Sequence, residues 1–395
     1  MKRVLIIGAG FLQQFVIRKA RDLNYYVIAI DGNPNAIGFK YAHEYECIDI
    51  VDQEKCLSFA SEKNIDGVLT AATDFGVLTA AYIAKELELP GIDYDVAKII
   101  KNKYLVKKIL FEKKVDDTDQ IYEIGSLSDL DKIEKNIKFP LMVKPCDGSG
   151  SRGASRVDDF NELVEACNKA MNASLIKKAV IETFINGKEY GAESLVVNGE
   201  ITVLAIMQKW MTKPPYYAEL GHAIPNDLNS NIEKKARNCV VNAIKELGIN
   251  QGSVNMDLLI TDDGNVYIVD IGARMGGNMI GPCIIPYGTG IDYMAAMIQA
   301  SVNDDYSLKI DSDKFAVVTR LLAFKSGIVK KVPDIEYLEN RYGVEIYHHL
   351  KKGMIVNEYH TNIDGCGYVV ARDESRKIAE EKVDEVVKYI ESYIF

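Results

Sequence analysis

Short apolar runs alternate with longer amphipathic segments through the first hundred residues. The apolar runs are VLIIGAG at 4–10, YVIAIDG at 26–32 and DGVLTAA at 66–72, and helical patterns cover 11–24 and 52–63. Strands that alternate with helices of this length are typical of βαβ units. The pattern therefore predicts a parallel sheet with helices on its faces.

The pattern changes after residue 100. A basic helical segment spans 98–114, and shorter strands with a few helices follow it. The predicted helices lie around 127–136, 158–171, 230–247 and 374–395, and the predicted strands lie around 120–125, 141–145, 179–185, 189–197, 200–210, 316–324, 345–350 and 367–373. A hairpin is predicted over 253–274, because Asp262, Asp263, Gly264 and Asn265 form a turn signal between two apolar runs.

Composition restricts the class of protein. Hydrophobic residues make up 48% and charged residues 26%, the ordinary balance of a globular chain. A formal charge of −10 disfavours a nucleic acid partner, because phosphate backbones are bound chiefly by Lys and Arg. Seven scattered cysteines without a Cys-x-x-Cys pair indicate reduced thiols. The apolar runs are too short to span a membrane, so we expect a cytoplasmic protein.

A glycine-rich loop follows the predicted strand at 141–145. The stretch LMVKPCDGSGSRG places Lys144 at the strand end and three glycines after it, among Ser149, Ser151 and Arg152. A fixed cation beside free backbone N–H groups suits phosphate oxygens. The loop lacks the Lys-Ser/Thr ending of a Walker A motif, and an ordinary surface turn is the alternative.

Acidic residues mark two further segments. In ETFINGKEYGAES, Glu182 ends a strand and Glu189 follows a turn at Gly187, so a hinge strand and a carboxylate could hold adenine and ribose. On the predicted hairpin, Asp257 and Asp270 lie on opposite arms, and the period of two places them on the face opposite to Leu258, Val269 and Ile271. Paired carboxylates suit Mg²⁺, which fills its octahedron with water and phosphate; solvated acids are the alternative at both places.

The first apolar run also permits a nicotinamide oxidoreductase. Gly8 and Gly10 end the first predicted strand and Asp31 ends the second. The third glycine of G-x-G-x-x-G is replaced by Gln13, however, and this glycine allows close packing of helix and strand. The dinucleotide fingerprint therefore fails at one position.

The lysine loop, the acids around Gly187, the hairpin aspartates and Arg274 together resemble the ATP-grasp ligases over nearly the whole chain. The chain is similar to the branch that contains the carbamoyl phosphate synthetase large subunit, biotin carboxylase, phosphoribosylglycinamide synthetase and the L-amino-acid ligases. The resemblance implies an α/β fold with a Rossmann-like domain at 1–100, an ATP-grasp α+β nucleotide domain at 101–305 with a mobile lid at about 115–182, and a small C-terminal α+β domain at 306–395.

The resemblance also implies roles for matching positions. ATP would be held by Lys103, Lys144, Gly148, Ser149, Gly150, Ser151, Gly153, Glu182, Phe184, Ile185 and Glu189. Asp257 and Asp270 match the ligands of Mg²⁺, with Mn²⁺ as the alternative metal, and Arg274 and Lys144 match catalytic residues that steady the transferred phosphoryl group. One departure stands out: Gly272 replaces the asparagine of Glu-x-Asn-x-Arg.

The acceptor side rests on fewer residues. The segment 214–226 resembles the E-x-G-H-x-x-P segment of carboxylate–amine ligases, which makes Glu219 and His222 substrate candidates together with Gly8 and Gly10. A structurally bonded histidine is the alternative for His222. The implied reaction is phosphorylation of a carboxylate by ATP and attack of an amine on the acyl phosphate, in a protein that could be a homodimer. A phosphoribosylglycinamide synthetase-like or carbamoyl phosphate synthetase-like enzyme and a catalytically silent ATP-binding module are the alternatives.

Overall fold

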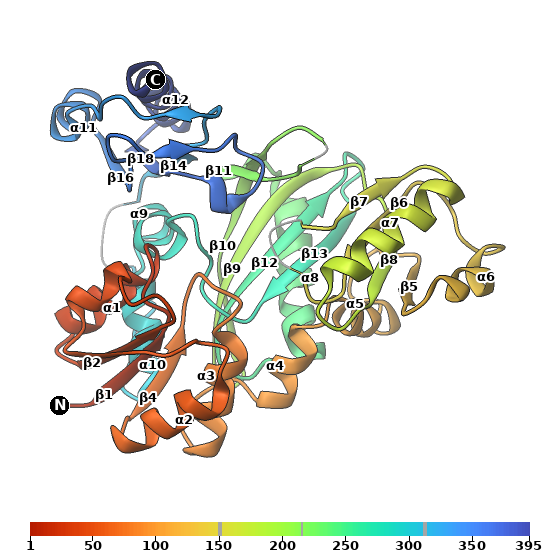
Figure 1. Cartoon of the computed structure of the whole chain (residues 1–395), viewed down its shortest axis with the longest axis horizontal. Coiled ribbons are helices and arrows are strands. Elements are labelled where there is room, and N and C mark those ends of the chain that lie inside the picture. The colour runs from red at the N-terminus through yellow and green to blue at the C-terminus, as the bar shows by residue number, and fades with distance from the viewer. Residues whose placement is uncertain (149–151, 215, 311–313) are drawn as a thin grey trace.

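The computed structural model describes residues 1–148, 152–214, 216–310 and 314–395. Figure 1 shows a parallel sheet at the N-terminal end, a long twisted sheet at the centre, a smaller sheet at the far side and the C-terminal helices above. Predicted contacts of Ser149, Gly150 and Ser151 lie outside the described residues. Across the described ranges, no helix is long and apolar enough to span a membrane.

The first hundred residues form the parallel sheet that the alternating pattern predicts. The strand order is β3 (Glu44–Cys47), β2 (Tyr26–Asp31), β1 (Arg3–Ile7) and β4 (Gly67–Thr70). Between them run α1 (Gln13–Asp22), the short η1 (Ile37–Tyr41) and α2 (Gln53–Glu62), and α3 (Val77–Glu86) follows β4. Gln13 packs under the first glycine loop and donates a hydrogen bond to the carbonyl of Ala71 at 2.7 Å.

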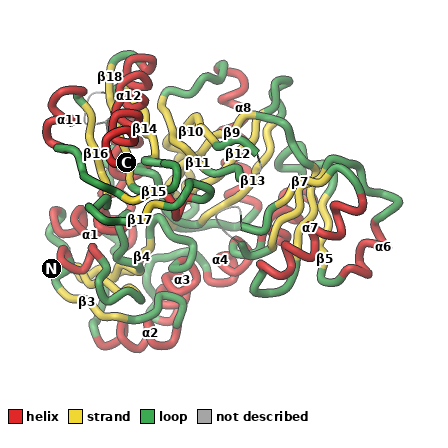
Figure 2. Tube along the Cα trace, turned by 45° about the horizontal axis from the view of Figure 1, so that its top comes forward, coloured by secondary structure: helices red, strands yellow, loops and turns green. Residues whose placement is uncertain are grey.

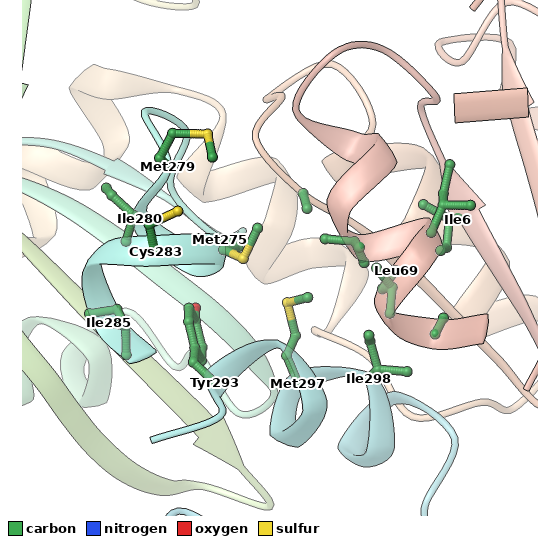
Figure 3. Packing of buried hydrophobic residues seen from close by; sticks show 14 of the residues in the cluster. Ile6, Leu69, Met275, Met279, Ile280, Cys283, Ile285, Tyr293, Met297 and Ile298 are labelled. Atoms are coloured by element: carbon green, nitrogen blue, oxygen red, sulfur yellow. The ribbon is translucent and has the colours of Figure 1, made fainter. Parts of the chain in front are cut away.

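The two faces of this sheet bury different helices. Leu5 and Ile7 point toward α2 and α3, whereas Val4 and Ile6 point toward α1 and toward α10 (Tyr293–Ser301). Figure 3 shows Met297 and Ile298 of α10 facing Leu69 and Ile6, with Met275 beside them. The helix α10, nearly 300 residues along the chain, thus completes the N-terminal sheet and its helices, which we name the first layer. The first layer shares one apolar core with Leu195, Met207 and Val317 from later in the chain.

The basic segment predicted as one helix over 98–114 is two helices. α4 (Tyr94–Ile100) ends before α5 (Lys103–Glu112) begins, and the side chain of Asn102 accepts hydrogen bonds from the backbone N–H groups of Tyr104 and Leu105. An asparagine at this position satisfies N–H groups that a new helix leaves unpaired. The break places Lys103 at the first turn of α5, where its side chain faces the central sheet.

Residues 121–183 form a unit with its own core, which we name the lid sheet. Its antiparallel strands are ordered β5 (Ile121–Ile124), β8 (Ala179–Thr183), β6 (Leu141–Pro145) and β7 (Ser155–Val157). The helical parts are η2 (Leu127–Asp129), α6 (Leu130–Ile133) and α7 (Phe160–Ala173). Leu163, Cys167 and Ala170 lie on one face of α7 and pack on the sheet, as a helical period requires.

An eight-stranded sheet carries the rest of the chain. Its order is β13 (Val266–Gly272), β12 (Gly252–Ile260), β9 (Lys188–Val197), β10 (Glu200–Met211), β11 (Glu219–Ile224), β14 (Ala316–Leu321), β18 (Gly367–Asp373) and β16 (Val344–His348). The helix α8 (Ser230–Glu246) covers one face of β9, β10, β12 and β13 through Val240 and Ile244. Because β11 pairs with β14, the C-terminal strands belong to the same sheet as β9 to β13.

Short elements complete the C-terminal part. They are η3 (Ile280–Ile284), α9 (Ile285–Thr289), β15 (Gly327–Ile328), α11 (Ile335–Tyr342), β17 (Ile355–Val356), η4 (Asn362–Asp364) and α12 (Arg376–Ile394). Val383, Val386 and Ile390 of α12 pack on β14 and β18. Figure 2 shows α11 and α12 over this end of the sheet, away from the lid sheet.

Candidate functional site

One cavity of about 960 Å³ lies between the lid sheet, the eight-stranded sheet and the first layer. Twelve of the predicted site residues line it: Lys103, Lys144, Gly148, Glu182, Phe184, Ile185, Glu189, Glu219, His222, Asp257, Asp270 and Arg274. Five segments that lie far apart in the sequence therefore meet around one space, as the resemblance requires. Among the described residues, the lining leaves out Gly8, Gly10 and Gly153.

These three glycines lie where the backbone conformation or close neighbouring atoms disfavour a larger residue. A Cβ on Gly153, which has a φ of +78°, would lie 2.8 Å from Cβ of Ala173 and 2.9 Å from Cγ of Pro145. Gly8 has a φ of +95°, and a Cβ on Gly10 would lie 2.9 Å from Oε1 of Gln13. Their predicted contacts with ATP and substrate stay predictions, while the first domain reaches the cavity through Leu12 and residues 72–75.

Glu182 lies between two lysines at the lid end of the cavity. Lys144 on β6 is 2.5 Å from Oε1, and Lys107 on α5 is 3.0 Å from Oε2. Burial raises the pKa of Glu182, but the charges of Lys107 and Lys144 outweigh it and hold the pKa at about 2. Lys107 escaped the sequence analysis; its signal is a spacing of four from Lys103, which puts both on one face of a helix.

The hairpin aspartates are direct partners across the two strands. Asp257 of β12 pairs with Asp270 of β13 in the antiparallel register, and both line the cavity. Lys103 forms an ion pair with Asp270, and Lys209 lies 2.7 Å from Asp257. Burial raises the pKa of Asp257, against the opposing charge of Lys209.

One detail of the hairpin prediction is wrong. Val269 was placed on the face opposite to the aspartates, but it lines the cavity. The register shifts after Asp257, so that Leu258 pairs with Ile268 and the strict period of two is broken on β13. A β-bulge of this kind puts two consecutive residues of one strand against one of the other, and alternation cannot predict it.

Lys209 of β10 is the charged residue that sequence reasoning missed at the centre of the site. Its side chain is 1% exposed, and its Nζ lies 2.5 Å from Glu219, 2.7 Å from Asp257 and 3.5 Å from Glu189. The burial lowers its pKa, but the surrounding carboxylates raise it well above the usual value. The sequence signal is a lysine within the apolar run AIMQKW.

The charges around the hairpin fit a divalent cation. Four carboxylates (Glu189, Glu219, Asp257 and Asp270) face two ammonium groups (Lys103 and Lys209), which leaves two formal negative charges. Mg²⁺ takes one or two carboxylates and completes its shell with water and phosphate. Within the described residues, no group of three or more His, Cys, Asp or Glu side chains is placed to hold a metal ion.

Glu219 has several partners at the end of the cavity where the acceptor substrate is expected to bind, which we name the acceptor end. Besides Lys209, it accepts hydrogen bonds from Asn278 and, at 3.2 Å, from Asn362 of η4. Burial raises the pKa of Glu219, but the charge of Lys209 outweighs it and holds the pKa at about 2. Glu219 is therefore ionised, and it contacts both Lys209 of β10 and Asn362 of the C-terminal part.

His222 lines the cavity as a neutral side chain. It is 2% exposed, and burial lowers its pKa to about 4. Its Nδ1 has no hydrogen-bond partner in the described part of the chain. An unpaired buried nitrogen of this kind is costly to leave unsatisfied.

Arg274 is held where β13 meets the first layer. Its Nε lies 2.8 Å from Oδ1 of Asp74, and its Nη1 lies 3.4 Å from Oδ1 of Asn255. Behind it, the fully buried Glu193 accepts hydrogen bonds from Tyr293 at 2.6 Å, Asn255 at 2.9 Å and the Gly276 amide at 3.1 Å. Burial raises the pKa of Glu193 to about 7, against these hydrogen bonds.

Family comparisons agree with this geometry. A family model of the ATP-grasp domain matches residues 137–282, and one of the L-amino acid ligase C-terminal domain 2 matches residues 320–394. The chain thus contains an ATP-grasp domain. The prediction that this protein is an ATP-grasp ligase is thereby confirmed.

Individual relatives of this ATP-grasp protein cover much of its length. The formate-dependent phosphoribosylglycinamide formyltransferase of Methanococcus vannielii is 24% identical over 358 residues, 86% of this chain and 84% of the relative. The D-alanine–D-alanine ligase of Acetivibrio thermocellus is 31% identical over 209 residues, 48% of this chain and 54% of the relative. At these identities, the relatives support the superfamily and leave the substrate open.

Solved structures confirm the predicted α/β fold. An L-amino acid ligase from Bacillus licheniformis superposes with a TM-score of 0.84 at 24% identity, covering 99% of this chain and 98% of its own. A phosphoribosylglycinamide synthetase from Anaerococcus prevotii gives 0.80 at 23% identity and 98% of both chains. The biotin carboxylase domain dimer of 2-oxoglutarate carboxylase from Hydrogenobacter thermophilus, in complex with MgADP, gives 0.79 at 18% identity, with 97% of this chain and 89% of its own.

Proposed function

We propose that this protein is a Mg²⁺- and ATP-dependent carboxylate–amine ligase that acts through an acyl phosphate. The observation that carries the proposal is the convergence of Lys103, Lys144, Arg274 and the acids of the hairpin around one cavity. Transfer of a phosphoryl group needs little more than placement and neutralisation of charge, and these side chains supply both.

Different residues of the cavity would bind the adenosine, the phosphates and the metal ion. The hinge at 182–185 and Glu189 would hold adenosine, and Lys144 and Lys103 would contact phosphate oxygens. Asp257 and Asp270 would hold Mg²⁺, which would supply Lewis-acid neutralisation of phosphate charge; Mn²⁺ is the alternative metal. The substrate carboxylate is the first nucleophile, so the chain needs no general base for phosphoryl transfer.

A pair of amino acids is the substrate class that we favour. The C-terminal family model belongs to L-amino acid ligases, and residues from that region, Thr361, Asn362 and Ile363, line the acceptor end of the cavity. There, ionised Glu219 suits a substrate ammonium group, and neutral His222 lines the same cavity. A phosphoribosylglycinamide synthetase-like or carbamoyl phosphate synthetase-like substrate remains the second candidate, supported by the relatives and structures of that kind.

The test is release of ADP from ATP and Mg²⁺ across pairs of amino acids, with bicarbonate and phosphoribosylamine as separate arms. We expect ADP with at least one amino-acid pair and a coupled product in equal amount, identified by mass. ADP only with phosphoribosylamine or bicarbonate would replace the amino-acid assignment. Binding of MgATP without ADP in any arm would make the protein a catalytically silent module.

Assembly and location belong to the same proposal. We propose a homodimer in the cytoplasm: one solved structural neighbour is a dimer, and all seven cysteines are free thiols, six of them buried. Sedimentation of the purified protein measures the first point, and fractionation of cells the second.

A further inference from the structure

The side chain of Asp74 links the first layer to Arg274 across 200 residues of sequence. Asp74 lies in the loop between β4 and α3, and its Oδ1 accepts from Nε of Arg274 at 2.8 Å. Asp74 is 32% exposed and Arg274 16% exposed at their side chains. Lys101 and Lys103 also face Asp74, so the carboxylate lies within a cationic group.

Gly272 provides the space for this ion pair. A Cβ on Gly272 would lie 3.0 Å from Cζ and 3.2 Å from Nη2 of Arg274, and 3.2 Å from Oδ1 of Asp74. These distances are tighter than ordinary van der Waals contact. The guanidinium and carboxylate therefore fill the volume that any larger residue at position 272 would need.

The backbone joins the same two segments. Ala71 and Met275 form an isolated parallel bridge, and the Ala72 amide donates to the Met275 carbonyl at 3.0 Å. Met275 itself is buried in the core that the first layer shares with α10 (Figure 3). The position of Asp74 relative to β13 is thus fixed by main-chain contacts and by packing.

We propose that Asp74 is a positioning residue that aims Arg274 at the transferred phosphoryl group, and that Gly272 is required because it leaves room for the Asp74–Arg274 pair. The inference rests on the proposed function. A free arginine at a strand end samples many rotamers, and transfer needs its fork in one place. The first domain then contributes to phosphoryl transfer through a residue on a loop, although it holds none of the predicted ATP contacts.

The test perturbs the pair from both sides. Asp74→Ala removes the acceptor, Asp74→Asn keeps its shape without charge, and Gly272→Ala pushes the guanidinium away. With the substrate pair found for the wild type, we expect kcat for ADP release to fall about tenfold to a hundredfold in Asp74→Ala and Gly272→Ala, less in Asp74→Asn, with KM for ATP changed by no more than about twofold.

The double variant separates positioning from general damage. Because both changes disrupt one pair, Asp74→Ala/Gly272→Ala should be no slower than the slower single variant within about threefold. Asp52→Ala removes the N-cap of α2 in the same domain and touches nothing in the cavity, so its kcat should equal that of the wild type. Multiplied losses in the double variant, a raised KM with unchanged kcat, or an equal loss in Asp52→Ala would overturn the inference.

A readout without turnover keeps the inference separate from the proposed function. Exchange of the Arg274 Nε–H proton, which Oδ1 of Asp74 accepts, should be about tenfold faster in Asp74→Ala than in the wild type, and unchanged in Asp52→Ala. Unchanged exchange in Asp74→Ala would refute Asp74 as the restraint on Arg274. A wild type that releases no ADP while the exchange result holds would refute the ligase function and leave the restraint on Arg274 in place.

Discussion

Lys144 is the residue whose place at the lid end is most directly tied to ATP. It reaches the cavity from β6 and lies 2.5 Å from Glu182. On the proposed assignment, Lys144→Ala removes a charge-assisted hydrogen bond to phosphate, so ATP affinity or kcat should fall about tenfold to a hundredfold. Lys132→Ala, at a largely exposed lysine of the lid sheet, is the control. Titration of ATP against ADP release measures both, and unchanged ATP turnover in Lys144→Ala would remove Lys144 from the site.

The hairpin aspartates should set the metal requirement. On the proposed assignment, Asp257→Asn and Asp270→Asn each remove a negatively charged ligand of Mg²⁺, so the Mg²⁺ concentration for half-maximal ADP release should rise about tenfold or more. Asp263→Asn lies in the turn of the same hairpin, away from the cavity, and should leave the Mg²⁺ curve unchanged. Coincident curves for all four proteins would show that neither aspartate binds the metal.

Glu193 should make stability depend on pH. Its pKa is raised by burial from 4.5 to about 7, so the folded state binds the proton more tightly than the unfolded state. This contribution is complete below pH 4.5 and is lost as pH rises through 7, which lowers the free energy of unfolding by roughly 3 kcal/mol. Glu193→Gln should lose less stability between pH 4.5 and 7.5 in urea titrations. Parallel pH curves for wild type and variant would contradict the raised pKa.

At the scale of elements, β4 and α10 approach through one glycine. A Cβ on Gly67 would lie 2.1 Å from the Ser301 carbonyl oxygen, which belongs to backbone that cannot rotate away. Gly67→Ala should therefore reduce the free energy of unfolding by about 1 to 3 kcal/mol, measured in urea. Gly32→Ala, after β2, meets only an ordinary contact at 3.5 Å and serves as the control. Equal stability of the two variants would mean that β4 and α10 are not in close contact.

The elements themselves could largely be predicted, because each is a local pattern. The hairpin turn at 262–265 fixed which strands pair, and the pairing brought Asp257 opposite Asp270. The break before Lys103 was missed because one basic segment reads as one helix until the capping role of Asn102 is considered. Asp74 and Lys209 could not be predicted as partners of the site, because no local pattern relates the loop after β4 to β13, or places β10 on the far side of β9 from β12.

At the scale of the molecule, part of the hydrophobic core of the first layer is supplied by residues from later in the chain. α10 and Met275 cover the face of β1 and β4 that carries Ile6 and Leu69 (Figure 3). A fragment of residues 1–100 would expose this face, so it should bind a hydrophobic dye and lack a cooperative thermal transition, unlike the full chain. A fragment that melts cooperatively without dye binding would show that the first layer is independent.

The wall of the cavity formed by Thr361, Asn362 and Ile363 belongs to a connecting segment with the single short helix η4, whereas other parts of the wall are built from paired strands. Loops accept changes of sequence that a paired strand does not tolerate. Substrate preference can thus change through residues 361–363 while the residues proposed to contact phosphate stay the same. Exchanging residues 361–363 is accordingly the economical way to redesign what this scaffold joins.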